Sequence, residues 1–181
     1  MRTVPVQPLF ASRVPAALPE LPTLVVVVDT EEEFEWSAPF SRQATSVSAM
    51  RYIDRAQRLC DAVGLAPTYV IDYPIATQPL GYETISGWAR EGRCRIGAHL
   101  HPWVNPPFDE VLSGPNSFMC NLSPALQDAK MRELHEAIAA NTGAAPRVFK
   151  AGRYGIGRDG LAILDELGFG VDASVNPCMN F

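Results

Sequence analysis

A run of five apolar residues that leads directly into acidic residues is the feature that most constrains the fold of this chain. Leu24–Val28 contains four consecutive valines, and it is followed by Asp29 and an acidic stretch that ends at Glu35. A short, uninterrupted run of β-branched residues is typical of a strand buried in a parallel sheet that is covered on both faces. A carboxylate at the C-terminal end of such a strand lies where α/β proteins bind ligands. The alternative is a buried strand that enters a solvated acidic loop.

Strand-like and helix-like patterns alternate along the rest of the chain. Further strands are predicted at 66–71, 93–98, 146–150 and 169–172, and helices at 47–63, 81–91, 124–142 and 161–167. The third helix has a clear start and stop, because Ser123 and Pro124 suit a helix N-terminus and Gly143 suits a helix C-terminus. Five strands that alternate with helices predict a parallel α/β sheet or barrel with right-handed crossovers.

Length and composition exclude several classes of protein. The 181 residues suit one domain, and a net charge of −5 without a long basic block argues against nucleic acid as a partner. No stretch is apolar enough to be a transmembrane segment. Residues 1–22 are proline-rich and lack the continuous apolar segment of a signal peptide, so we expect an irregular leader, a domain over 23–181 and a cytoplasmic location. The four cysteines form no C-x-x-C pattern and are expected to be free thiols.

Polar side chains follow three of the predicted strands. These are Asp29 and Glu31 after the first strand, His99 and His101 after the third, and Lys150 and Arg153 after the fourth. Because the C-terminal ends of parallel strands meet at one edge, we expect these side chains to converge. Two imidazoles and a carboxylate suit a divalent metal ion, most readily Zn²⁺. The third histidine, His135, is flanked by charged residues and is expected to be an exposed helix residue.

Four motifs in order resemble the polysaccharide deacetylase family with its NodB homology domain, a carbohydrate esterase family 4-like fold. They are the apolar strand with Asp29-Thr-Glu31, Ile96-Gly-Ala-His-Leu-His-Pro-Trp103, Phe149-Lys-Ala-Gly-Arg-Tyr-Gly155 and Gly168-Phe-Gly-Val-Asp-Ala-Ser-Val-Asn-Pro177. The resemblance spans roughly residues 23–178. It implies a distorted (β/α) barrel, a carbohydrate substrate and metal-dependent removal of acetyl groups from N-acetylated sugars.

The resemblance also implies roles for single residues. Asp29 matches the catalytic base and Glu31 the carboxylate metal ligand, with Glu32 as the alternative because the acidic run makes the alignment ambiguous. His99 matches the first histidine ligand. The second histidine of the family falls where this chain has Trp103, so His101 is its local substitute.

Further roles concern the base and the substrate groove. Lys150 stands where the family has an arginine that orients the base, and Arg153 is the alternative. Trp103 and Tyr154 are candidates to stack on a sugar ring, or else belong to the core. The motif that begins at Asp172 matches a wall of the groove.

The chain also departs from the family pattern. It has no later histidine to serve as general acid, so we expect a domain that lacks its last strands and associates through open strand edges. A catalytically degenerate module that binds sugar or metal is the main alternative function. A magnesium-dependent phosphotransferase built on Asp29 and Glu31 is less favoured, because Mg²⁺ prefers oxygen ligands to histidine.

Overall fold

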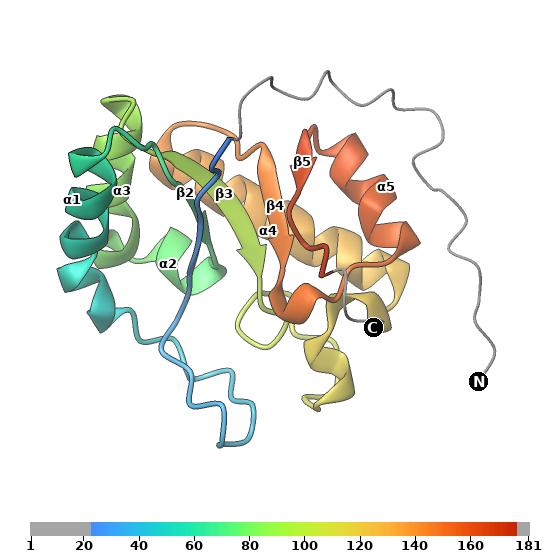
Figure 1. The fold of residues 1–181 in the computed structure, drawn as a ribbon. Coiled ribbons are helices and arrows are strands. Elements are labelled where there is room, and N and C mark those ends of the chain that lie inside the picture. The colour runs from blue at the N-terminus through green and yellow to red at the C-terminus, as the bar shows by residue number, and fades with distance from the viewer. Residues whose placement is uncertain (1–22, 177–181) are drawn as a thin grey trace.

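Five parallel strands lie in one sheet in the same order as along the chain, β1-β2-β3-β4-β5, in a computed structural model that describes residues 23–176 (Figure 1). The strands are β1 (Val27–Thr30), β2 (Thr68–Ile71), β3 (Arg95–Leu100), β4 (Val148–Ala151) and β5 (Val171–Asp172). All four neighbouring pairs are parallel, which confirms the predicted α/β class. The predicted leader, residues 1–22, and Cys178 lie outside the described residues.

The helices follow the predicted alternation with two differences. They are α1 (Asp54–Ala62), α2 (Tyr73–Thr77), α3 (Pro79–Arg90), α4 (Pro124–Thr142) and α5 (Arg158–Glu166), with short 3-10 helices η1 (Ser48–Tyr52), η2 (Pro115–Ser117), η3 (Met119–Asn121) and η4 (Gly152–Tyr154). The helix predicted over 47–63 is divided into η1 and α1. Helix α2 was not predicted, because Pro74 was interpreted as a stop, whereas here it lies in the first turn of the helix.

The termini of α4 are as predicted. The Ser123 hydroxyl accepts a hydrogen bond from the backbone N–H of Leu126, and Pro124 occupies the first turn, where no intrahelical donor is needed. Gly143 ends the helix with a φ of 84°, a left-handed conformation that glycine adopts without a steric penalty.

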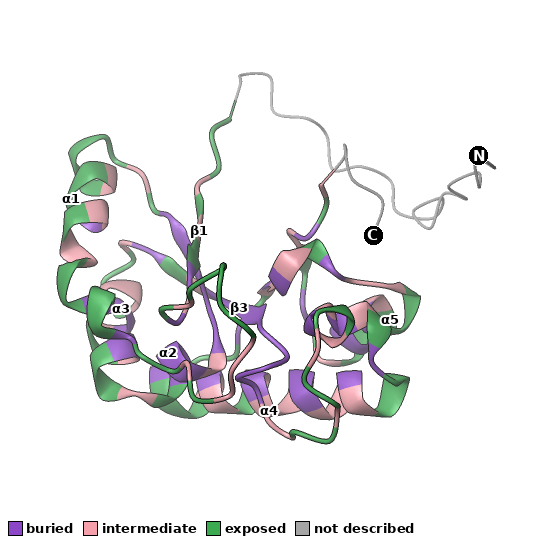
Figure 2. Ribbon diagram, turned by 90° about the horizontal axis from the view of Figure 1, so that it is seen from below, coloured by how far each residue is buried: buried purple, intermediate pink, exposed green. Residues whose placement is uncertain are grey.

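The helices form an arc around one side of the sheet when the molecule is viewed along its strands (Figure 2). The core lies between this arc and the sheet, and its largest buried side chains include Tyr69 and Ile71 on β2, Phe149 on β4 and Leu134 on α4. Among the described residues, no helix is both long and apolar enough to cross a bilayer.

The prediction that Leu24–Val28 is buried on both faces is wrong. Leu24 and Val25 precede β1 and are 70% and 72% exposed, and Val27 is 37% exposed. Strand β1 is at the edge of the described sheet, so it has a hydrogen-bonded neighbour, β2, on one side only. The valine run therefore indicated a strand here, but the strand comprises Val27–Thr30 and its burial was not predicted.

His135 is also not the exposed residue that its charged neighbours suggested. Its ring packs edge-on against Phe169, with ring centroids 5.6 Å apart, and its Nε2 atom is buried without a hydrogen-bond partner in the described structure. Cys60, Cys94 and Cys120 are free thiols, as predicted.

Candidate metal and hydrolytic site

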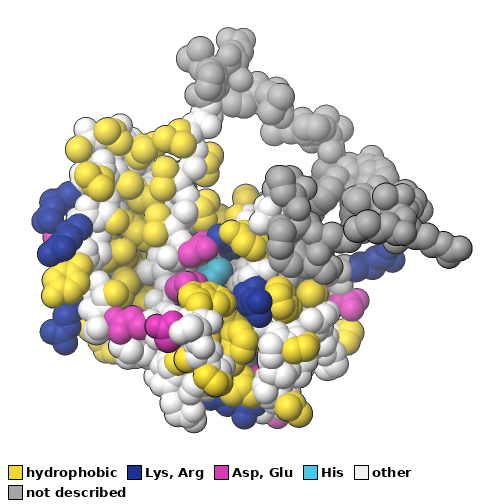
Figure 3. All heavy atoms as spheres, turned by 60° about the horizontal axis from the view of Figure 1, so that its bottom comes forward, with side chains coloured by type: hydrophobic (Ala, Val, Ile, Leu, Met, Phe, Trp, Pro, Cys, Tyr) yellow, Lys and Arg dark blue, Asp and Glu magenta, His cyan; other side chains and the backbone are white. Residues whose placement is uncertain are grey.

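Side chains from the ends of β1, β3 and β4 line one pocket at the C-terminal edge of the sheet. Parallel register places His99 beside Lys150, and the segment after β1 extends past the same edge. The pocket has a volume of about 200 Å³, and its lining consists of Asp29, Glu31, Trp36, His99, His101, Lys150, Ala151, Arg153 and Tyr154. Figure 3 shows this hollow with a histidine at its base and acidic and basic side chains around it.

Three potential metal ligands form a nearly equilateral triangle in this pocket. The His99 Nε2 and His101 Nε2 atoms are 3.1 Å apart, and the Glu31 Oε2 atom lies 3.2 Å from the first and 3.1 Å from the second. Both histidines are almost fully buried, whereas Glu31 is partly exposed. Burial acts to raise the pKa of Glu31, but His101 and His99 outweigh it when they are protonated, because their rings then donate hydrogen bonds and carry positive charge, and they hold this pKa below its ordinary value.

The other ring nitrogens fix which tautomer each histidine adopts. His99 Nδ1 lies 3.0 Å from the backbone carbonyl oxygen of Lys150, which can only accept, so Nδ1 donates. His101 Nδ1 lies 2.8 Å from Glu32 Oε2, and it donates to this group when Glu32 is ionised, because a carboxylate can only accept. Each Nε2 atom of a neutral ring therefore presents a lone pair to the centre of the triangle.

This donor set fits a divalent metal ion. Two imidazole lone pairs and a carboxylate oxygen repel one another at 3.1–3.2 Å unless a cation or a proton lies among them. In a tetrahedral zinc site with bonds of about 2.0–2.1 Å, the ligand atoms are about 3.3 Å apart, close to the separations observed here. The N–H groups that face away from the centre donate to a carbonyl and a carboxyl group, as is usual for metal-binding histidines.

An ion pair lies beside the triangle. Lys150 Nζ is 2.5 Å from Asp29 Oδ2, and Asp29 remains 36% exposed at the side chain. Arg153, the predicted alternative partner of Asp29, is held elsewhere: it donates to the Ser117 hydroxyl and lies over the Phe118 ring, 3.9 Å from its centroid. The positively charged neighbour of Asp29 is therefore Lys150.

The loop that carries Arg153 has an unusual backbone. Arg153 and Tyr154 have φ values of 55° and 60°, the left-handed region that non-glycine residues rarely adopt. Strained conformations of this kind are concentrated at functional sites, where the surrounding structure holds them. Tyr154 is partly exposed and lines the pocket, and its ring lies 5.0 Å from the Lys150 amine.

Two predicted site residues do not line the pocket. Trp103 is 1% exposed and donates from Nε1 to Glu32 Oε1 at 2.8 Å, so it has no free face for a sugar and belongs to the core, the other reading of its position. Asp172 accepts hydrogen bonds from the backbone N–H and hydroxyl of Ser174, and that hydroxyl in turn accepts from the Ala151 N–H on β4. Asp172 thus supports β4 from outside the pocket.

Three residues at the site were not predicted in their observed positions. Trp36 lines the pocket and is 56% exposed, and its ring packs edge-on against the ring of Phe34. Glu32, considered only as an alternative ligand, is buried behind His101, and Asp72 lies next to it at the end of β2. Aromatic character beside the acidic run was the available signal for Trp36, but no sequence pattern links Asp72 to residues 40 positions earlier.

Glu32, Asp72 and His101 form a second group with enough donors for a metal. Burial raises the pKa of Asp72 well above its ordinary value, and the adjacent Glu32 carboxyl group raises it further. Burial also raises the pKa of Glu32. Asp72, the more deeply buried of the two, therefore keeps its proton more readily than Glu32, which accepts from His101 Nδ1 as a carboxylate. This group suits a hydrogen-bonded support better than a second metal site.

Comparisons with known proteins show the fold. No protein-family model matches the sequence, and no curated protein matches it significantly. Among solved structures, the chain aligns with a family 4 carbohydrate esterase from Streptomyces lividans in complex with acetate at a TM-score of 0.52 and 14% identity, covering 81% of this chain and 60% of that one. It aligns with the chitin deacetylase of the fungal pathogen Colletotrichum lindemuthianum at 0.53 and 16% identity, covering 82% and 57%.

A third match has a different functional description. The CE4 family pseudoenzyme from Bacillus anthracis aligns at a TM-score of 0.56 and 13% identity, covering 82% of this chain and 42% of that one. The chain therefore spans about half the length of the solved structures that it matches. The matches confirm the predicted resemblance at the level of the fold. Because enzymes and a pseudoenzyme share this fold, the activity has to be argued from the site itself.

Proposed function

We propose that this chain, which has the fold of the family 4 carbohydrate esterases and polysaccharide deacetylases, carries a metal-dependent site that removes acetyl groups from N-acetylated sugars. The observation that carries the proposal is one pocket in which the Glu31–His99–His101 triangle lies beside the Asp29–Lys150 ion pair. Hydrolysis of an amide at neutral pH needs an activated water molecule and stabilisation of a developing oxyanion.

The two parts of the pocket support different roles. Glu31, His99 and His101 would hold a divalent ion, most readily Zn²⁺ because two of the three ligand atoms are imidazole nitrogens. When bound, such an ion supplies an acidified water molecule and polarises a carbonyl group. Asp29 is the residue in reach of solvent that would accept the proton of that water, and Lys150 orients its carboxylate through the ion pair.

The walls of the pocket suit a sugar. Trp36 and Tyr154 are partly exposed aromatic side chains on its rim, whose rings offer flat apolar faces to the C–H groups of a pyranose. The pocket volume of about 200 Å³ suits a single acetylated sugar residue rather than a large ligand. Trp36 thus takes the stacking role that was one of the two alternatives for Trp103.

The proposal predicts different defects for Asp29→Asn and Glu31→Gln. With Zn²⁺ and N-acetylglucosamine oligomers, the first variant should lose acetate release by at least ~100-fold, the usual effect of removing a general base, while it still binds zinc. The second should bind zinc more weakly, because it loses an anionic ligand. Acetate release and zinc titration measure the two effects. Glu35→Gln, which removes the same charge from an exposed residue of the acidic run, is the control and should behave like the unaltered protein.

Reversed defects in the two variants would show that the roles of Asp29 and Glu31 are misassigned. The main alternative, a catalytically silent module that binds sugar or metal, is motivated by the pseudoenzyme of this fold and by the shift of the second histidine from the family position to His101. Stoichiometric zinc binding with no acetate release from any N-acetylated oligosaccharide would favour that alternative. A stable phospho-aspartate at Asp29 would instead favour a phosphotransferase.

A further inference from the structure

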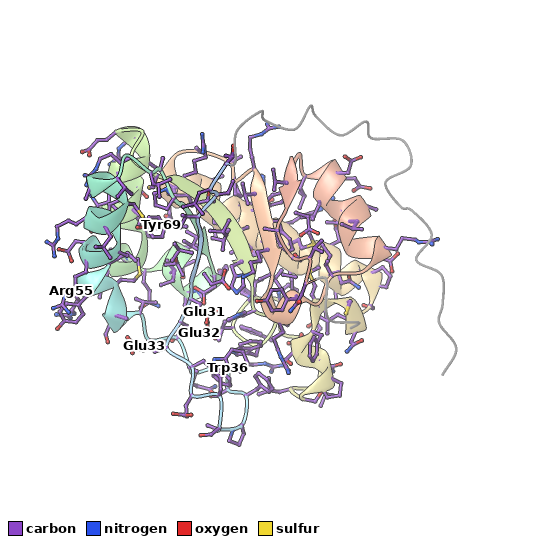
Figure 4. All side chains as sticks on the ribbon, viewed as in Figure 1. Glu31, Glu32, Glu33, Trp36, Arg55 and Tyr69 are labelled. Atoms are coloured by element: carbon purple, nitrogen blue, oxygen red, sulfur yellow. The ribbon has the colours of Figure 1, made fainter. Side chains whose placement is uncertain are left out.

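The buried carboxyl group of Glu32 joins the candidate metal site to the protein interior. Its side chain is almost fully buried, and each oxygen accepts one hydrogen bond: Oε2 from His101 Nδ1 and Oε1 from Trp103 Nε1, both at 2.8 Å. Glu31 and Glu32 are adjacent in the segment that follows β1 (Figure 4). Their surroundings differ, since Glu31 lines the pocket and Glu32 is buried.

Asp72 anchors the segment that carries Glu32. Asp72 is fully buried, and its Oδ2 atom accepts a hydrogen bond from the backbone N–H of Glu32 at 2.7 Å. Its Oδ1 atom accepts from the backbone N–H of Ile75 at 2.9 Å and so caps helix α2. Through these two hydrogen bonds, the Asp72 side chain connects the segment after β1 with the start of α2, which follows β2.

The His101 ring is constrained on its face as well as at its edge. Trp103 is stacked against it, with ring centroids 4.2 Å apart and an interplanar angle of 22°. The same indole donates to Glu32, so the tryptophan, the carboxyl group and the imidazole form a closed buried cycle. His99 differs, because its Nδ1 atom donates to a backbone carbonyl that no substitution removes.

We propose that Glu32, anchored by Asp72 and Trp103, is a positioning residue that fixes the tautomer and orientation of His101, so that Nε2 faces Glu31 and His99. The expected effect on metal affinity rests on the proposed function. The effect on the tautomer and orientation of His101 concerns the metal-free protein alone. A neutral imidazole exchanges between two tautomers, and a carboxylate at Nδ1 selects the one whose Nε2 lone pair is free. The Glu32 carboxylate behind the site therefore supports the zinc ligand set through His101.

The test is Glu32→Gln, which preserves the size of the side chain. When the amide oxygen accepts from Trp103, the amide NH₂ group faces His101 Nδ1 and favours the opposite tautomer, with hydrogen on Nε2. In the metal-free protein, ¹⁵N-resolved NMR should show His101 protonated on Nδ1 in the unaltered chain and on Nε2 in the variant. Competition with a chromogenic chelator should show zinc affinity reduced by about 10–100-fold.

Tyr69→Phe controls for the loss of a buried hydrogen bond. Tyr69 is fully buried on β2 and donates to Gln57 at 3.0 Å, away from Glu31 and Glu32 in the sheet (Figure 4). The Tyr69→Phe variant should have a lower melting temperature, but its His101 tautomer and zinc affinity should be unchanged. If Glu32→Gln does not fold, Asp72→Asn is the second variant: asparagine also caps α2, and the loosened Glu32 should weaken zinc binding to a smaller extent.

Two results would overturn the inference. One is an unchanged His101 tautomer and zinc affinity in Glu32→Gln, which would leave Glu32 with a structural role only. The other is a metal-free protein of the original sequence in which His101 is neutral and carries its hydrogen on Nε2. Failure of the proposed function is distinguishable, because an inactive chain would still show the tautomer change.

Discussion

The position of a hydrogen on each histidine ring decides what this site can bind, and this is a property of single residues and their partners. His99 and His101 were recognisable in the sequence as a pair at i and i+2. Their partners were not, because the Lys150 carbonyl and the Glu32 carboxyl group lie 51 and 69 positions away. A pattern of residue types indicates possible ligands, whereas the fold determines which nitrogen of each ring is available.

His135 provides a residue-scale prediction that is independent of the pocket. Burial lowers its pKa below 6.5, Arg132 lowers it further, and Glu136 opposes the shift. The folded state therefore binds fewer protons than the unfolded state just below pH 6.5, so its stability should decrease as the pH falls through this range. His135→Leu should reduce this pH dependence, measured as the urea midpoint between about pH 7 and pH 5.

The informative quantity is the difference between the two proteins, because it isolates the contribution of His135 to the pH dependence of stability. A steeper loss of stability in the original chain than in His135→Leu is expected. Parallel curves would mean that the buried Nε2 atom finds a partner when it is protonated.

At the scale of elements, the sequence predicted where strands and helices alternate but not how deeply each strand is buried. The valines of Leu24–Val28 specify an extended chain because β-branched side chains favour it, whether or not a second layer covers them. Pro74 ended a predicted strand correctly, but Asp72 before it is a helix cap as well, and only the cap shows that α2 begins there. Local propensities therefore recovered the alternation of elements, while burial depended on neighbours distant in the sequence.

The close approach of the β4–η4 connection to the end of β3 gives an element-scale prediction. A Cβ atom on Gly152 would lie 2.5 Å from His101 Cδ2 and 2.5 Å from the Leu100 carbonyl oxygen. Gly152→Ala should therefore displace the His101 ring, weaken zinc binding and destabilise the fold by about 1–3 kcal/mol, the usual effect of overpacking. Thermal melts and zinc titration measure both effects.

Gly87→Ala is the matched control for this substitution. Gly87 lies inside α3, and a Cβ atom added there would have no neighbouring atom within 4 Å. Alanine at this position should therefore stabilise the helix by about 0.5–1 kcal/mol and leave zinc affinity unchanged. Equal zinc affinity in Gly152→Ala and the original chain would show that the connection yields without moving His101.

At the scale of the whole molecule, the described sheet has two edges, β1 and β5, each with one hydrogen-bonded neighbour. The β1 edge also carries apolar side chains in solvent, since Leu24, Val25 and Val27 are all exposed. Elsewhere on the surface, Leu59 of α1 and Val63, which follows it, are 73% and 68% exposed. An unprotected edge beside apolar surface favours strand pairing between molecules.

We therefore expect the 181-residue chain to self-associate through β1. Full burial of a valine or leucine side chain stabilises by about 1.5–3 kcal/mol, so covering several of them, together with new hydrogen bonds between strands, offsets a cost of association of about 4–15 kcal/mol. Light scattering coupled to size-exclusion chromatography should show a dimer or larger species whose proportion rises with concentration. Val25→Lys, which places a charge at the edge, should shift the protein towards monomer, whereas Val111→Lys on an equally exposed loop should not. A monomer at every concentration, or the same shift in both variants, would show that β1 does not mediate association.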